Sequence, residues 1–177
     1  MRQGSEFTMP GTDDGLLPWQ AQRSLRRILV PVDAFGRCAG SLAAAAEFAV
    51  EMSGELRMVH VRVWNTTGRG HSRFFFETSE EATAILEAAL SGVWSRGVRA
   101  SGVVVDAEWT QVARVIVAEA EGCGAGFIVV ARRRRWALSR LLSSSISGQV
   151  MRAANCPVLV VRGSGPAIAE VSSNVSR

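Results

Sequence analysis

The chain has 177 residues and a net charge of +4, and 47% of its residues are hydrophobic. This length suits one domain with a sizeable core, and no apolar run approaches the roughly 18 to 20 residues that a membrane span requires. All 20 basic residues are arginine, which codon bias explains most simply, so the charge leaves open only a weak attraction to anionic surfaces. We therefore expect a soluble globular protein with no membrane partner.

Both ends of the chain lack sustained hydrophobic periodicity. The opening MRQGSEF contains Gly-Ser-Glu-Phe, which two adjacent cloning sites would encode, so we expect residues 1–24 to be a vector-derived and flexible lead-in. The domain should span residues 25–163, and residues 164–177 should form a flexible tail. The sequence shows no secretory signal, and its odd number of cysteines favours a reducing cytoplasm.

The first predicted elements are a strand and a helix. RRILVPVD, residues 26–33, is rich in Ile, Leu and Val and is typical of a buried strand. In the helix that follows, Ser41 is the expected N-cap and Gly54 the expected stop. Its apolar face should consist of Leu42, Ala45, Ala49 and Met52.

A second strand is predicted over ELRMVHVRV, residues 55–63. The connection from Trp64 to Thr78 begins with a polar piece, NTTGRGHS, and we expect it to be irregular. It also contains three consecutive phenylalanines, residues 74–76, which we expect to be covered by apolar side chains.

The second helix begins at TSEE, where Thr78 and Glu81 match a capping box, and it should end near Gly97. A third strand is predicted over residues 98–106. Thr110 is the expected cap of a third helix, which should end at Gly122 and have a buried stripe of Val112, Val115, Ile116 and Ala120.

The remaining pattern predicts a strand at residues 127–131, a helix at residues 145–154 and a last strand at residues 157–162. Strands that alternate with helices require parallel pairing through right-handed crossovers. The fold class is therefore α/β, a doubly wound five-stranded parallel sheet with helices on both faces. In such folds ligands bind beyond the carboxyl ends of the strands, where the winding direction reverses.

Two polar residues lie on or after the predicted strands. Asp33 follows the first strand, where its carboxylate could accept hydrogen bonds from a ribose hydroxyl or an adenine amino group, or could cap a turn, and the residues themselves leave both open. His60 lies inside the second strand, where a single histidine is more often a hydrogen-bonded structural residue than a catalyst.

The cysteines indicate no chemistry. Cys38, Cys123 and Cys156 have neither a CxxC nor a metal-ligand spacing, and none has a histidine or acid at an interpretable distance. We predict no metal site and no catalytic residue. Cys123 and Cys156 should be small buried residues, and Cys38 should be more exposed. The GCGAG motif at 122–126 precedes a strand, so it indicates a turn and not a phosphate loop.

ARRRRWALSRLLSSSISG, residues 131–148, follows the fourth predicted strand. Its serines lie where a helix begins, and the free N–H groups and dipole of that end favour an anion, although an N-cap alone needs one serine. The arginines at 132–135 form either a solvated edge or a site for an anionic ligand. Nucleic acid is disfavoured as a partner, because Trp136 is a single candidate for stacking and no recognition helix is present.

A family resemblance rests on five segments in this order and spacing: RRILVPVDAF, HV, FIVVA, LSRLL and SSISGQVMRAANCPVLVVR. The chain resembles the universal stress protein family over nearly all of residues 26–162. VMRAANCPVLVVR is the most specific piece. The resemblance implies the strand order 3-2-1-4-5. It also implies a homodimer through the last strand, Pro157 to Val161, whose apolar edge needs a partner.

Members of that family that bind ATP carry the motif G-x2-G-x9-G-[ST] after strand four and an aspartate after strand one. Here Ala131, Arg134 and Ser144 replace the three glycines, and Ser145 keeps its residue type. Arg134 is the serious departure, because a Cβ hinders the backbone from curling around phosphates, although its guanidinium could contact phosphates directly. The binding residues that the resemblance implies are Pro31, Asp33, Val61, Val130, Ala131, Arg133, Arg134, Ser144, Ser145, Ile146 and Ser147.

These observations favour a cytoplasmic universal stress response protein that acts as a binding or signalling module, with ATP binding weakened or lost. The alternative is a family member that binds ATP or AMP and hydrolyses ATP slowly or phosphorylates itself. Efficient phosphoryl transfer needs a base and a pair of metal-binding carboxylates, and only Asp33 is in place, so the sequence favours a protein that is not an enzyme. ATP or another adenine nucleotide is the candidate ligand.

Overall fold

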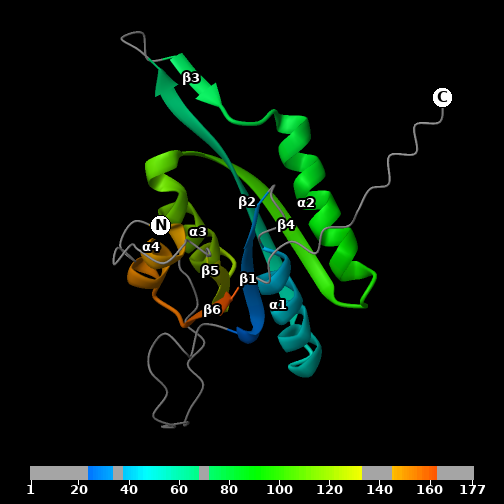
Figure 1. Ribbon diagram of the computed structural model, residues 1–177. Coiled ribbons are helices and arrows are strands. Elements are labelled where there is room, and N and C mark those ends of the chain that lie inside the picture. Colours follow the sequence, from blue (N-terminus) through cyan, green and yellow to red (C-terminus); the bar gives the residue numbers. More distant parts are fainter. Residues whose placement is uncertain (1–23, 34–37, 68–71, 133–144, 163–177) are drawn as a thin grey trace, which may run out of the picture.

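The computed structural model describes residues 24–33, 38–67, 72–132 and 145–162 (Figure 1). The predicted alternation of strands and helices is confirmed in these residues, and one strand and a short 3-10 helix are added to it. In chain order the elements are β1 (Ser24–Val32), α1 (Ala39–Glu51), β2 (Glu55–Thr67), β3 (Ser72–Phe75), α2 (Ser79–Trp94), β4 (Arg99–Glu108), η2 (Trp109–Gln111), α3 (Val112–Gly122), β5 (Ala125–Arg132), α4 (Ile146–Ala153) and β6 (Val158–Arg162).

Five strands form a parallel sheet in the order β4-β2-β1-β5-β6. This is the predicted order, with β4, β5 and β6 as the third, fourth and fifth strands of the expected pattern. The sixth strand, β3, was not predicted. It pairs antiparallel with the last four residues of β2, with Trp64 opposite Phe75 and Thr67 opposite Ser72.

The helices cover both faces of the sheet, α1 and α2 on one and α3 and α4 on the other (Figure 1). Each central strand contributes side chains to the apolar layers on both faces of the sheet, because neighbouring side chains of a strand point to opposite faces. In β1, Val30 packs with the α1 and α2 layer and Leu29 packs with the α3 and α4 layer, and both are fully buried. The core is therefore two apolar layers separated by one sheet.

The helix ends follow local chemistry, and one of three predicted caps is confirmed. The Thr78 hydroxyl accepts a hydrogen bond from the Glu81 N–H at 3.2 Å, and the Glu81 carboxylate accepts one from the Thr78 N–H at 2.7 Å. The Ser41 cap is wrong, because α1 begins two residues earlier and the buried Ser41 hydroxyl donates to the Cys38 carbonyl. The Thr110 cap is wrong too, because Thr110 lies within η2.

The predicted stop at Gly54 has a different cause from the one expected. The residue with positive φ after α1 is Ser53, at 50°. Gly54 is required by close packing, since a Cβ at that position would lie 2.3 Å from the carbonyl oxygen of Arg26. A glycine there lets the start of β2 approach β1.

The expected apolar cover of the three phenylalanines is wrong for two of them. Phe74 is 54% exposed and Phe76 is 63% exposed, with their rings in an edge-to-face contact at 5.6 Å. Phe75, on the other face of the hairpin, has the Arg62 guanidinium 4.2 Å from its ring centre. The β2–β3 hairpin projects beyond the end of β1 (Figure 1), and the described residues leave Phe74 and Phe76 largely uncovered.

Candidate functional site

The carboxyl edge of the sheet brings together the predicted site residues that the structure describes. Val32, the last residue of β1, lies opposite His60 of β2, and Asp33 follows it directly. On the other side of β1, the last paired residues that the structure describes are Leu29 and Ile128 of β5. Pairing between β1 and β5 thus ends before the carboxyl ends of these strands, at the point where the winding direction of the fold reverses.

The predicted strand residues of this edge differ in exposure. Pro31, Asp33, Val61 and Ala131 are half-buried, whereas Val130 is only 4% exposed and packs within the α3 and α4 layer. The Val130 side chain thus offers little surface to a ligand. The structure therefore makes Val130 a core residue beneath the edge, and Pro31, Asp33, Val61 and Ala131 remain accessible.

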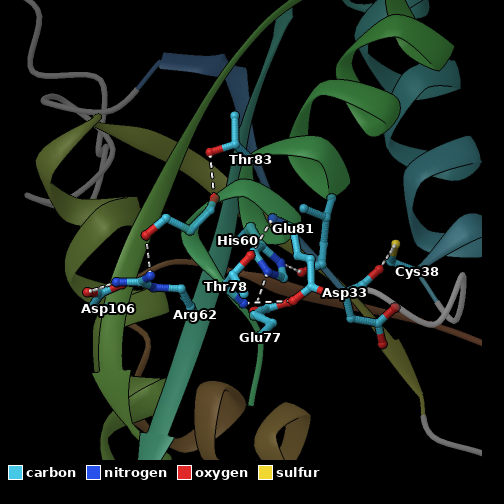
Figure 2. A network of polar contacts seen from close by, with 11 residues as sticks. Asp33, Cys38, His60, Arg62, Glu77, Thr78, Glu81, Thr83 and Asp106 are labelled. Atoms are coloured by element: carbon cyan, nitrogen blue, oxygen red, sulfur yellow. Dashed lines mark hydrogen bonds and ion pairs between the residues drawn. The ribbon is translucent and has the colours of Figure 1, made fainter. Parts of the chain in front are cut away.

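Asp33 lies close to the start of α1 (Figure 2). Its main-chain carbonyl is 4.0 Å from the Sγ atom of Cys38, the N-cap residue of α1. Burial raises the pKa of the Cys38 thiol, and the charge of the Asp33 carboxylate raises it further. A raised pKa disfavours the thiolate form, which is the nucleophilic form of a cysteine.

His60 is held by two hydrogen bonds and is 4% exposed (Figure 2). Its Nδ1 atom lies 3.0 Å from the carbonyl oxygen of Val32, and its Nε2 atom lies 2.8 Å from Oε1 of Glu77. Glu77 lies between β3 and the N-cap of α2. The prediction of a hydrogen-bonded structural histidine is confirmed. The sequence did not single out Glu77, because the contact depends on a hairpin that was not predicted.

Arg62, two residues further along β2, lies at the centre of a second polar cluster. Its guanidinium makes two parallel hydrogen bonds to Asp106 of β4, from Nε to Oδ1 at 2.7 Å and from Nη2 to Oδ2 at 2.6 Å. Arg62 also donates to the Ser79 hydroxyl at the start of α2. Hydrogen bonds from Arg62 lower the pKa of the Asp106 carboxyl below its usual value. This cluster joins β2, β4 and α2 at the rim of the sheet.

The two described serines at the start of α4 form hydrogen bonds within the fold. The Ser145 hydroxyl accepts from the Gly148 N–H at 3.1 Å, which makes Ser145 the N-cap. The Ser147 hydroxyl donates to the Ala131 carbonyl at 2.8 Å and so connects α4 to the end of β5. Ile146 packs against the α3 and α4 layer. The predicted site residues Arg133, Arg134 and Ser144 lie outside the described residues.

The amino edge of the sheet contains a cavity of different character. It is lined by Arg27, Glu55, Leu56, Arg57, Ser101 and Cys123. Arg27 pairs with Glu55 at 2.6 Å, and Arg57 pairs with Glu119 at 2.7 Å. Because both arginines already contact carboxylates, this cavity offers little net charge to an anion. The GCGAG turn lies at this same edge, as predicted, with Gly124 at φ +66°.

The expectations on the exposure of the cysteines can be compared with the structure. Cys38, Cys123 and Cys156 are all half-buried, so the expected difference between a more exposed Cys38 and two buried cysteines is wrong. Among the residues that the structure describes, no group of three or more His, Cys, Asp or Glu side chains could hold a metal ion. No helix in the described part of the chain is long and apolar enough to cross a membrane.

Comparison with known proteins gives a consistent result. The model of the universal stress protein family matches residues 24–162. Universal stress protein YxiE of Bacillus subtilis (strain 168) is 30% identical over 148 residues, which are 77% of this chain and 98% of that protein.

Solved structures share the fold of this chain. A universal stress protein of Archaeoglobus fulgidus in complex with dAMP has a TM-score of 0.57 and 24% identity, with 77% of this chain and 97% of that chain covered. A universal stress protein in complex with cAMP has a TM-score of 0.62 and 17% identity, with 79% and 98% covered.

Proposed function

Because the chain belongs to the universal stress protein family, we propose that it is a stress response protein that acts as a cytoplasmic binding module for an adenine nucleotide with few phosphates. Binding of ATP is weaker than in family members that keep the full glycine motif. The nucleoside end of the ligand contacts Asp33 and Val61, and its phosphate lies near the start of α4.

One observation carries this proposal. Pairing of β1 with β2 continues to Val32 and His60, whereas the last described pair between β1 and β5 is Leu29 and Ile128. Pairing of the two central strands thus ends before their carboxyl ends, at the position where doubly wound folds bind their ligands. Asp33 and Ala131, which flank this position, are half-buried and can contact a ligand. The relatives solved with dAMP and cAMP support an adenine mononucleotide as the ligand.

The phosphate end of the site is the weaker one. In the glycine motif that the family uses for ATP, this chain has Ala131, Arg134 and Ser144. A bare backbone is needed to bring several N–H groups to a triphosphate, and side chains at these positions hinder that approach. A single phosphate needs fewer such contacts, and the first turn of α4 supplies N–H groups in an eight-residue helix. The ligand with one phosphate is therefore favoured over ATP.

Isothermal titration calorimetry with AMP, cAMP and ATP tests the proposal. We expect AMP or cAMP to bind in the micromolar range and ATP to bind no more tightly. Asp33→Ala should weaken AMP binding about tenfold or more, since a hydrogen bond to a charged group contributes about 1.5–3 kcal/mol. Tighter binding of ATP than of AMP, or no effect of Asp33→Ala, would contradict the proposal.

Arg134→Gly separates two roles of the arginine. If Arg134 hinders the triphosphate, the glycine variant should bind ATP more tightly and AMP unchanged. If Arg134 is instead a phosphate ligand, the variant should bind both nucleotides more weakly. We expect the first result, because a glycine at this position restores one element of the family motif.

We also propose a homodimer through β6. Among the described residues β6 pairs only with β5, at one end of the sheet, and its Leu159 side chain is 37% exposed. An exposed apolar strand edge favours pairing with a second copy. Light scattering should show a dimer, and Leu159→Lys should shift it towards monomer. A wild-type monomer would contradict this assignment and leave the nucleotide proposal unaffected.

A further inference from the structure

His60 connects two segments that are far apart in the sequence (Figure 2). One of its nitrogens contacts Val32, the residue immediately before Asp33, and the other contacts Glu77, the residue immediately before the N-cap of α2. The His60 and Glu77 side chains are only 5% and 15% exposed, so water competes little for these hydrogen bonds. The end of β1 and the start of α2 are thus joined through one imidazole ring.

The partners of the ring fix where its hydrogens lie. The Val32 carbonyl oxygen can only accept, so Nδ1 carries a hydrogen. The 2.8 Å contact of Nε2 with the Glu77 carboxyl requires a second hydrogen between those two atoms, because two bare acceptors would repel each other. Whether that hydrogen resides on the nitrogen or on the oxygen, the ring needs Glu77 to satisfy both of its nitrogens.

The second hydrogen-bond partner of His60 comes from a different segment of the chain. A buried histidine can be satisfied by main-chain groups of its own sheet, but here the second partner comes from the chain that returns from the β2–β3 hairpin. The hairpin is placed against β2 by the pairs of β3 and by the hydrogen bond from the Phe76 N–H to the Val63 carbonyl at 3.1 Å. Glu77 therefore approaches His60 from a fixed direction.

We propose that His60 and Glu77 are a positioning pair for the adenine-nucleotide site. Glu77 holds the imidazole ring, and the ring holds the Val32 carbonyl. Because this carbonyl belongs to the peptide that joins Val32 to Asp33, the contact orients that peptide and, with it, the Asp33 carboxylate that extends towards the ligand. The inference rests on the proposed function of Asp33 and adds two residues that do not touch the ligand. It assigns the hairpin the role of carrying Glu77 to the site.

Three variants test the pair with matched chemistry. Glu77→Ala removes the partner of Nε2. Glu77→Gln keeps a partner, because its amide N–H can donate to a neutral Nε2 while Nδ1 still donates to Val32. Glu81→Ala is the control: it removes a carboxylate of the same helix start that caps Thr78 and does not contact His60. Circular dichroism establishes that each variant is folded at the temperature of the measurements.

The first readout is the nitrogen spectrum of the histidine rings in the protein without nucleotide. We expect Nδ1 of His60 to carry a hydrogen in the wild type, and the Nε2 signal to change strongly in Glu77→Ala and little in Glu81→Ala. A His60 ring without a hydrogen on Nδ1, or a spectrum insensitive to Glu77→Ala, would overturn the pair.

The second readout is AMP affinity by calorimetry. We expect Glu77→Ala to weaken AMP binding about tenfold, and Glu77→Gln and Glu81→Ala to stay within about threefold of the wild type. Equal losses in Glu77→Ala and Glu81→Ala would overturn the inference, because the effect would then come from α2. If the wild type binds AMP and Glu77→Ala binds it equally well, the inference fails alone. If the wild type binds none of AMP, cAMP and ATP, the proposed function fails, and the positioning role fails with it.

Discussion

The two edges of the sheet use polar residues in opposite ways. At the amino edge, Arg27 and Arg57 pair with carboxylates in a partly open cavity, and Gly54 packs against the backbone of Arg26. At the carboxyl edge, a buried histidine holds the end of β1, and two phenylalanines remain more than half exposed. At the amino edge the charged side chains are paired with one another, whereas the carboxyl edge also has accessible residues that follow or end strands, and folds of this class bind their ligands at the carboxyl edge.

The largest expected effect on the free energy of unfolding comes from a substitution at the amino edge. Gly54→Ala places a Cβ 2.3 Å from the Arg26 carbonyl oxygen, and a backbone atom cannot move away cheaply. We expect a loss of about 3 kcal/mol in the free energy of unfolding, measured by urea denaturation. Gly92→Ala is the control, because nothing lies within 4 Å of a Cβ at this exposed position of α2. That variant should be stabilised by up to about 1 kcal/mol. Equal stabilities would contradict the close packing of Gly54.

The second prediction compares one carboxylate from each edge. Glu77→Ala leaves a nitrogen of the buried His60 without its partner and should cost about 2 kcal/mol in the free energy of unfolding. Glu119→Ala removes the partner of Arg57, whose side chain is 27% exposed and can be rehydrated, and should cost less than about 1 kcal/mol. Urea titration of both variants under the same conditions checks the order. A larger loss in Glu119→Ala would reverse the contrast between the edges.

The third prediction concerns the exposed aromatic pair of the carboxyl edge. Because Phe76 is already 63% exposed, its replacement removes little buried apolar surface and one edge-to-face contact with Phe74. We expect Phe76→Ser to lower the free energy of unfolding by about 1 kcal/mol. A loss comparable to that of Gly54→Ala would show that the ring is covered in solution, for example by a second molecule. Repeating the measurement at several protein concentrations identifies such a contact.

The smallest expected effect is a pH dependence at the rim of the carboxyl edge. Hydrogen bonds from Arg62 lower the pKa of Asp106 in the folded protein, so the folded state binds a proton there less readily than the unfolded chain does. The contribution of Asp106 to stability is complete above the unfolded aspartate pKa of about 3.9 and is lost as the pH falls through the lower folded value. Asp106→Asn should therefore lose less stability on acidification than the wild type. Urea midpoints measured from neutral to acidic pH provide the check, and identical slopes would contradict it.

Most of the fold could be predicted from the sequence because its signals are local. Apolar runs such as RRILVPVD fix the parallel strands, and the capping box of Thr78 and Glu81 fixes the start of α2. The strand β3 was missed because its sequence, SRFF, follows a polar piece rich in Gly and Thr. The signal that could have found it is two short runs of aromatic and β-branched residues separated by glycines, which is typical of a hairpin.

The candidate site was harder to predict than the fold. Asp33 and Ala131 could be placed at the carboxyl edge because they follow or end predicted strands, whereas Val61 was named only through the family resemblance. Glu77 could not be placed there, since its contact with His60 joins residues 17 positions apart through a hairpin. Val130 stays a predicted binding residue, and its side chain is only 4% exposed because both faces of the sheet are covered by helices. The prediction about Arg134 stays a prediction, because that residue lies outside the described part of the chain.

The unusual length of β2 has a consequence for how the molecule opens. Over Glu55–His60 this strand is hydrogen-bonded to β1 on one side and to β4 on the other, whereas its last described residues, Asn65–Thr67, pair with β3 alone. Amide hydrogens in the doubly paired part exchange with solvent only when most of the sheet unfolds, and those near the hairpin end exchange through local fluctuations. We therefore expect hydrogen exchange, measured residue by residue, to be slow in the doubly paired part of β2 and faster towards its hairpin end, so that a single strand reports on both global and local opening.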